Sequence, residues 1–437
     1  GDTRAADEST TPQEGDMIAR TGNVGVVTLV LVLAAACSSD AGLASTTSTT
    51  SATSTPGGID TTASVESTMA PPAPTEPTEQ ATGFPIATFA AISEDPVTEE
   101  LGDEFQAALA LHDVADGGGM SATVMTAEGT WSGTTGKADG VRDLQVDDQF
   151  AIASITKSVV AAQVMLMVEA GELGLDDLVA DHLPGDLQFD TNGATLRQLL
   201  SHRSGVPDYY DLLDSSQQTE FQRVWTPTEI LELLPPQRTP PGSTFSYAET
   251  NYLLLSVMIE HVRGRALADV LRDGALAVDG LERLVYQPEE SPTEPMAMPA
   301  GASNAVLEAR GGYLPSLASA TAYHASGAIA SDSPSLARWW RAFCAGEIVS
   351  QSSLTEMSTF EPADHIGSYG LGVYNPANGY ALAFGHTGQL PGYMSWAACL
   401  PEDGAVIVVL TNHEVDDGHL AFSHGLARPL VDVLRSR

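Results

Sequence analysis

A serine and a lysine three residues apart are the residues of this chain whose types and spacing most directly suggest chemistry. Ser154 and Lys157 occur in the segment Phe-Ala-Ile-Ala-Ser-Ile-Thr-Lys, and the chain contains one other lysine, Lys137. A serine hydroxyl is a weak nucleophile until a base or a nearby charge activates it. Residues three apart share one face of a helix, so the amine would lie within reach of the hydroxyl. The pair predicts acyl transfer through a serine ester.

A long apolar segment would position this pair. Residues 155–170 are apolar on nearly every side of a helix and end at Gly171, a pattern typical of a buried helix. If that helix begins at Ser154, the hydroxyl lies where free backbone N–H groups and the helix dipole favour negative charge. Because a serine three residues before a lysine also arises by chance, the pair alone is weak evidence, and its place at the start of a buried helix strengthens it.

Two later segments carry side chains suited to the same chemistry. Tyr247 and Glu249 directly precede an apolar helix expected over residues 252–262. A Gly-His-Thr-Gly-Gln segment, containing His386, follows a strand expected over residues 381–384. Tyrosine and histidine side chains are both used to transfer protons in enzymes.

Together these segments resemble the three active-site motifs of serine β-lactamases and penicillin-binding proteins: Ser-x-x-Lys, Tyr-x-Asn and Lys/His-x-Gly. The resemblance is closest to the class C β-lactamase and DD-carboxypeptidase group (S12-type serine hydrolases) and covers residues 98–437 in family order. It implies a β-lactamase/transpeptidase-like α/β (α+β) fold. In this fold an antiparallel sheet is formed from both ends of the domain, flanked by helices, with an inserted helical region. Strands expected over residues 120–125 and 130–136 at one end, and over residues 371–374, 381–384, 394–400 and 406–410 at the other, agree with it, as do the helices expected between them.

The resemblance also implies roles for individual residues. Ser154 is expected to be acylated, Lys157 to accept its proton or assist electrostatically, and Tyr247 to pass a proton to the leaving group. The backbone N–H groups of Ser154 and Gln389 are expected to form the oxyanion hole. The reaction requires no metal and no organic cofactor. The residues expected to bind the substrate carboxylate and line the cleft are His386, Thr387 and Gly388.

Glu249 departs from the family pattern, which has Asn at this position. The Asn amide donates to the substrate carbonyl, whereas an ionised Glu can only accept. An ionised Glu would also favour the charged form of Lys157 and leave Tyr247 as the better candidate for proton transfer. The alternatives are that Glu249 is protonated or turned away. His386, in place of the lysine of most β-lactamases, resembles exported DD-carboxypeptidases and related esterases and peptidases.

These features predict an exported serine hydrolase acting through an acyl-enzyme. A D-alanyl-D-alanine carboxypeptidase-like activity on peptidoglycan stem peptides is the first hypothesis. The alternative, which Glu249 motivates, is an esterase, amidase, D-aminopeptidase or β-lactamase on the same fold. A catalytically silent peptidoglycan-binding module is the alternative outside enzymes. The expected partner is a small-molecule or peptide substrate.

The start of the chain has the features of an export signal. An apolar run of thirteen residues, 24–36, follows Arg20 and is too short to span a bilayer. It leads into Leu-Ala-Ala-Ala-Cys, which resembles a bacterial lipobox with Cys37 as the lipidated residue. We therefore expect residues 1–37 to be an export signal, with residues 1–16 an untranslated leader before Met17.

A stretch rich in Ser, Thr and Pro follows and is expected to be a disordered linker over residues 38–97. The hydrolase domain is then expected over residues 98–437. Lipidation at Cys37 would anchor the protein to the outer face of the bacterial cytoplasmic membrane; without it the protein would be secreted. Membrane contact is expected only through the lipid.

Charge and cysteine content exclude other classes of protein. The formal net charge of −38 argues against binding to nucleic acid, which requires basic surfaces. Three cysteines are too few for a disulfide-dense scaffold. Cys344 and Cys399 either pair or remain separate buried thiols, and the sequence favours neither. A cluster near the C-terminus matches no standard metal spacing, so no metal site is expected; it comprises His413, Asp416, Asp417, His419 and His424.

Overall fold

The computed structural model describes residues 83–112, 117–213, 220–236, 238–300, 312–413 and 425–437. These residues belong to one compact unit that extends over residues 77–437. The predicted export signal, the lipidation residue Cys37 and the linker up to residue 82 lie outside the described residues. None of the described helices is long and apolar enough to cross a membrane.

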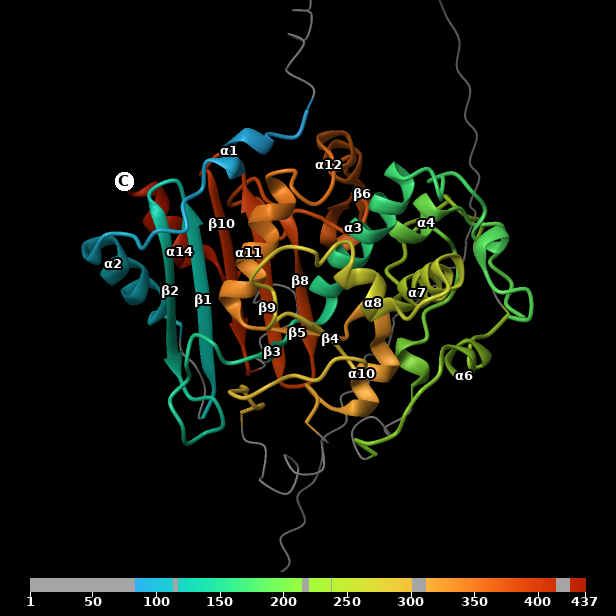
Figure 1. Ribbon diagram of the computed structural model, residues 1–437, viewed down its shortest axis with the longest axis horizontal. Coiled ribbons are helices and arrows are strands. Elements are labelled where there is room, and N and C mark those ends of the chain that lie inside the picture. Colours follow the sequence, from blue (N-terminus) through green and yellow to red (C-terminus); the bar gives the residue numbers. More distant parts are fainter. Residues whose placement is uncertain (1–82, 113–116, 214–219, 237, 301–311, 414–424) are drawn as a thin grey trace, which may run out of the picture. The chain divides into compact units, whose positions relative to one another are not determined.

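The described unit is built on a five-stranded antiparallel sheet that joins the two ends of the domain. Two of its strands come from the N-terminal part and three from the C-terminal part, as Figure 1 shows by colour. In spatial order the strands are β2 (Gly129–Gly136), β1 (Gly119–Thr126), β10 (Ala405–Thr411), β9 (Tyr393–Leu400) and β8 (Phe384–Leu390). The predicted fold class is therefore confirmed.

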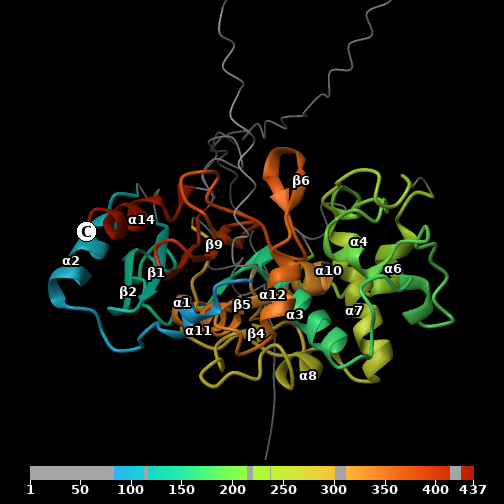
Figure 2. The same cartoon turned by 90° about the horizontal axis from the view of Figure 1, so that it is seen from above.

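Both faces of the sheet are covered by helices (Figure 2). Alternate residues of β10 pack into two different hydrophobic cores. Ile407 and Val409 belong to the core that includes residues of helices α2 and α14. Val406 and Val408 belong to the core that includes residues of helix α11. Because successive strand residues point to opposite faces, a strand covered on both sides is apolar throughout. The covering helices are α1 (Ile86–Ala90), α2 (Glu99–Leu109), α11 (Ser333–Cys344) and α14 (Arg428–Arg435).

A helical region lies beside β8, the strand at one end of the sheet (Figure 1). Helix α3 (Thr156–Glu169) is buried along most of its length and packs against α7 (Glu249–Arg263). This confirms the buried helix predicted over residues 155–170. The other helices of the region are α4 (Leu196–Leu200), α6 (Pro227–Glu232), α8 (Leu267–Arg272) and α10 (Leu317–Tyr323).

Shorter elements complete the described fold. A small sheet has the order β3 (Phe150–Ala151), β5 (Ile329–Ser331), β4 (Val285–Tyr286), and a hairpin pairs β6 (Glu361–Ala363) with β7 (Gly367–Tyr369). Helix α12 spans Gln351–Met357. The 3-10 turns are η1 (Ala153–Ile155), η2 (Val179–His182), η3 (Tyr210–Leu212), η4 (His324–Ser326) and η5 (Asp364–Ile366).

The compact unit begins earlier than residue 98, where the sequence analysis placed its start. Phe84, Phe89 and Ile92 are buried in the main hydrophobic core, and Phe89 belongs to helix α1. The Ser/Thr/Pro-rich composition that suggested a linker up to residue 97 ends near Pro85, and the apolar residues after it are enough to bury a short helix.

Two strand predictions near the C-terminus were wrong. Of residues 371–374 only Tyr374 forms bridges, and these are isolated; Gly372 has a φ of 74°, which a regular strand does not allow. The strand expected over residues 381–384 instead spans Phe384–Leu390 and carries the Gly-His-Thr-Gly-Gln segment itself. Its central residues are small or polar, so the apolar pattern that predicts a strand ends at the residue where the strand begins.

Cys344 and Cys399 form a disulfide that ties the end of α11 to β9. The bond closes a sequence separation of 55 residues between a covering helix and the sheet. Of the two alternatives that the sequence left open, the structure contains the paired form.

Candidate active site

Ser154 lies in a 3-10 turn that leads directly into helix α3. Its neighbour Ala153 has a φ of 51°, a backbone conformation that non-glycine residues rarely adopt and that the surrounding structure must hold in place. Lys157 follows in the first turn of α3, and its Nζ lies 3.0 Å from Ser154 Oγ. The structure therefore brings together the two residues that the sequence paired.

Lys157 is surrounded by acceptors. Its side chain has no exposed surface, and besides the Ser154 hydroxyl its Nζ donates to Glu249 Oε2 at 2.7 Å and to the Ser326 carbonyl oxygen at 2.8 Å. Burial lowers the pKa of Lys157, and the Glu249 carboxylate opposes this shift. Since three acceptors match the three N–H bonds of an ammonium group, we assign the protonated form.

Glu249 is the first residue of helix α7 and faces into the site. Its side chain is 11% exposed and forms a buried ion pair with Lys157. It is therefore not turned away, and the charged pair is the arrangement expected for an ionised Glu. The following asparagine of this segment, Asn251, lies elsewhere, where it accepts from Ser204 Oγ and contacts His202 Nδ1.

Asp208 places a second carboxyl group beside this pair. Its Oδ1 accepts the backbone N–H of Glu249 at 2.9 Å. Burial and then the charge of Glu249 raise the pKa of Asp208 to about 7. The sequence analysis did not identify Asp208, because no local pattern predicts its role.

Tyr247 lies next to the Ser154–Lys157 pair. Its ring centroid is 4.9 Å from Lys157 Nζ. Burial and the charge of Glu249 raise the pKa of Tyr247 well above its ordinary value, and a hydrogen bond with Ser154 opposes the shift. The phenol is therefore protonated at neutral pH and can donate a proton.

His202 supports Tyr247 from behind, a role that the sequence analysis missed. The two rings stack with centroids 4.1 Å apart. The imidazole Nδ1 accepts the backbone N–H of Ala248 at 3.1 Å, and Asn251 Nδ2 lies 3.0 Å from the same nitrogen. Burial and then the charge of Lys157 lower the pKa of His202 well below its ordinary value. The ring is thus neutral and fixed against the phenol.

Strand β8 passes directly against the turn that carries Ser154. A side chain at Gly388 would come within 2.2 Å of the Ile152 carbonyl oxygen, so only glycine allows this approach. Within β8 His386 is buried, and its Nε2 lies 3.0 Å from the Tyr369 hydroxyl. The Thr387 hydroxyl contacts Tyr374 at 2.6 Å, and Gln389 is exposed. The motif residues predicted to line the cleft therefore share the strand beside Ser154.

The sequence profile of the Beta-lactamase family matches residues 107–427, which is most of the chain and includes all of these residues. The chain belongs to the Beta-lactamase family. Within it, penicillin-binding protein 4* of Bacillus subtilis (strain 168) is 31% identical over 156 residues, covering 35% of this chain and 34% of that protein. D-aminopeptidase of Cereibacter sphaeroides (strain ATCC 17029 / ATH 2.4.9) is 26% identical over 321 residues, covering 72% of this chain and 60% of that protein. The chain thus spans between a third and three fifths of these relatives.

The chain is also similar to solved structures. The D-amino acid amidase of Ochrobactrum anthropi SV3, in complex with L-phenylalanine amide, superposes with a TM-score of 0.65 at 25% identity. The match covers 77% of this chain and 98% of the amidase. The fold of this Beta-lactamase family member is thus similar to that of the amidase over most of both chains.

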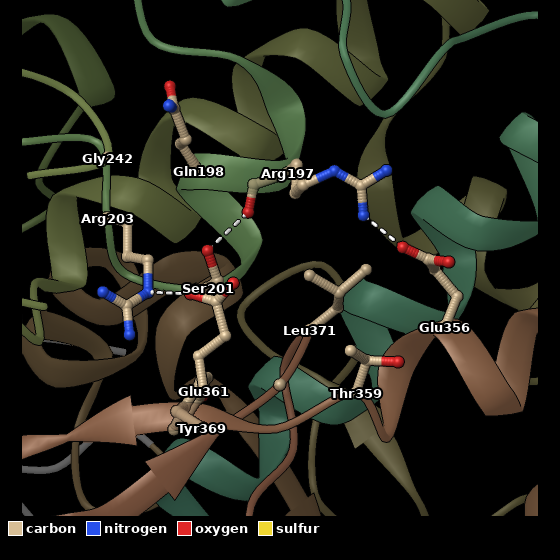
Figure 3. Close-up of a pocket in the computed structure, with 11 residues that line it drawn as sticks. Arg197, Gln198, Ser201, Arg203, Gly242, Glu356, Thr359, Glu361, Tyr369 and Leu371 are labelled. Carbon is tan, nitrogen blue, oxygen red and sulfur yellow. Dashed lines mark hydrogen bonds and ion pairs between the residues drawn. The ribbon is translucent and has the colours of Figure 1, made fainter.

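A pocket of about 220 Å³ is lined in part by Tyr369, the residue whose hydroxyl contacts His386 in the candidate active site (Figure 3). Its two arginines are each engaged by a glutamate: Arg197 by Glu356, and Arg203 Nε by Glu361 Oε2 at 2.8 Å. The pocket therefore offers no uncompensated cation to a substrate carboxylate. Of the residues weighed as metal ligands in the sequence, all but His413 lie outside the described part of the chain.

Proposed function

We propose that Ser154 attacks the carbonyl carbon of an amide, peptide or ester and that water then hydrolyses the acyl-enzyme. The observation that carries this proposal is the 3.0 Å contact between Ser154 Oγ and Lys157 Nζ at the start of a buried helix, with the Tyr247 ring centroid 4.9 Å from the same Nζ. Backbone N–H groups of Ser154 and Gln389 receive the developing oxyanion, since fixed donors there cost no reorganisation during the reaction.

The charged state of Lys157 determines the proton path in this proposal. An ammonium group has no lone pair, so Lys157 stabilises the negative charge that develops on Ser154 Oγ and does not accept its proton. The serine proton passes to the Tyr247 oxygen while the phenol proton passes to the leaving nitrogen or oxygen. The carbonyl carbon gains the Ser154 Oγ bond and loses the bond to the leaving group, and Tyr247 ends as a phenol.

Two finer activities are compared: that of a D-alanyl-D-alanine carboxypeptidase, and that of a D-aminopeptidase or amidase. A carboxypeptidase must bind the free carboxylate of its substrate, and Lys157 and His386 are the cationic or titratable side chains of the site that would do so. Lys157 is instead paired with Glu249, and the His386 nitrogens contact the Tyr369 hydroxyl and the Thr387 carbonyl oxygen. Two carboxyl groups, those of Glu249 and Asp208, instead lie at the site, which suits a substrate with a protonated amine. We therefore favour the aminopeptidase or amidase class, and the likeness to D-aminopeptidase and D-amino acid amidase supports this choice.

Steady-state kinetics on matched substrates tests this choice. D-phenylalanine amide, its N-acetyl derivative and an N-acylated D-alanyl-D-alanine peptide would be compared with wild type and Ser154→Ala. We expect the free amine to give the largest kcat/KM, and Ser154→Ala to be inactive on all three. A preference for the N-acylated D-alanyl-D-alanine peptide would favour the carboxypeptidase instead.

We further propose that the protein is exported and lipid-anchored through Cys37, which lies outside the described residues. The Cys344–Cys399 disulfide supports export, because disulfides persist mainly in oxidising compartments. Metabolic labelling with an alkyne fatty acid in a bacterial host tests the anchor: wild type should carry the label and Cys37→Ala should not. Equal labelling of the two would exclude Cys37 as the lipidated residue.

A further inference from the structure

The second half of the proposed reaction requires a base that the first half does not provide. Hydrolysis of an ester at Ser154 needs a group that takes a proton from the attacking water. Lys157 is assigned as an ammonium group with all three N–H bonds engaged, so it cannot accept. Tyr247 takes up a proton only while it gives up its own, so it is a relay and not a resting base. Neither residue offers water a free basic acceptor.

Glu249 is the carboxylate that lies closest to this chemistry. Glu249 Oε2 and Ser154 Oγ both contact the same Lys157 Nζ, at 2.7 Å and 3.0 Å. The carboxylate and the acylated oxygen are thus separated by a single intervening atom. Water bound between a carboxylate and an ester carbonyl in such a site would be correctly placed for attack.

One oxygen of Glu249 is available to water. Lys157 holds Oε2, whereas in the described structure Oε1 has no hydrogen-bond partner, and the side chain keeps 11% of its surface exposed. The backbone N–H of Glu249 is fixed by Asp208 Oδ1, so the residue is held at the start of helix α7. A carboxylate with one anchored and one free oxygen is suited to general-base catalysis.

We infer that Glu249 is the general base of deacylation, an inference that rests on the proposed acyl-enzyme. Water gives a proton to Glu249 as its oxygen bonds to the ester carbonyl carbon. The tetrahedral intermediate collapses with cleavage of the bond between that carbon and Ser154 Oγ, and Lys157 gives a proton to the departing Oγ. The proton on Glu249 then returns to Lys157, so that one water is consumed and the resting ion pair is restored. The family motif places an amide here, which cannot perform this step.

The isosteric variant Glu249→Gln tests the assignment with p-nitrophenyl acetate as the acyl donor. We expect a burst of p-nitrophenol close to the enzyme concentration, followed by turnover slower by about 10²- to 10⁴-fold, the usual contribution of a general base. Intact-mass spectrometry should show an acetyl adduct that accumulates on the variant but not on wild type. Hydroxylamine, which attacks esters without a base, should release the adduct. Glu128→Gln, at an exposed turn between β1 and β2, serves as a control that should match wild type.

The outcomes separate this inference from the proposed function. An adduct that forms and decays on Glu249→Gln at the wild-type rate would overturn the role of Glu249 alone. Slower acylation without accumulation would also overturn it, because Glu249 would then act on the first step. Absence of any adduct at Ser154 on both proteins would instead contradict the acyl-enzyme. Should Glu249→Gln not fold, Glu249→Asp keeps the charge and must still show a selective loss of deacylation; unchanged deacylation in that variant would overturn the inference.

Discussion

Lys157 Nζ and Glu249 Oε2 form a buried ion pair at 2.7 Å within the candidate active site. The pair accounts for the charge state of the lysine and for the different parts that Lys157, Tyr247 and Glu249 play in the proposal. It also makes Lys157 important for folding, because burial of an unpaired charge is costly.

Removal of the lysine charge should therefore destabilise the protein. We expect Lys157→Met to lower the free energy of unfolding by about 3–5 kcal/mol, the usual effect of breaking a buried pair. The double variant Lys157→Met/Glu249→Gln should recover part of this loss, because the remaining partner is then neutral. Urea denaturation of the three proteins gives the values, and a double variant no more stable than the single one would show that the pair does not carry the effect.

Removal of the Tyr247 hydroxyl should reduce catalysis with little effect on stability. We expect Tyr247→Phe to lower kcat by about 10²- to 10⁴-fold, since proton transfer to the leaving group is lost. The stacking of the ring on His202 is retained, so the melting temperature should change little. Tyr380→Phe is the matched control, because that hydroxyl has no hydrogen-bond partner in the described structure. A Tyr247→Phe enzyme with wild-type kcat would assign the proton transfer to another residue.

His202 is expected to act as a positioning residue for Tyr247. His202 has a φ of 56°, which asparagine tolerates better than most residues, so His202→Asn should fold. Loss of the stacked ring should lower kcat by about 10- to 100-fold while KM changes little, because the phenol is no longer fixed. Steady-state kinetics with D-phenylalanine amide would measure both constants. Equal effects on kcat and KM, or none on either, would contradict the positioning role.

Asp208 should make stability depend on pH. Its pKa rises from 3.8 to about 7 on folding, so between these values the folded protein binds more protons than the unfolded chain. The free energy of unfolding then falls as pH increases through this range. Asp208→Asn keeps the oxygen that accepts the Glu249 N–H but does not titrate. Its stability relative to wild type should therefore increase from pH 4 to pH 8, by up to about 1.4 kcal/mol per unit of pKa displacement. Urea denaturation at several pH values would measure the difference, and a constant difference would contradict the shift.

The sequence predicted most of the fold because each of the three motifs is a short continuous segment and the three occur in the order found in the family. Ser154 and Lys157 are three residues apart on one helix, so their contact follows from helix geometry. The strand containing His386 was placed too early because its polar residues face the site and break the apolar pattern. Asp208 and His202 were missed because both approach Tyr247 and Glu249 from about forty residues earlier in the chain. Only tertiary packing brings these segments together, and neither residue has a local pattern that predicts its role.

The most direct test of this account is identification of the acylated residue. Wild type and Ser154→Ala would be incubated with a fluorophosphonate probe, which reacts irreversibly, and analysed by intact-mass spectrometry and peptide mapping. The account predicts a single adduct on Ser154 of the wild type and no adduct on the variant. An adduct on another residue, equal labelling of both proteins, or no adduct on the folded wild type would contradict it, and the last result would favour a catalytically silent binding module.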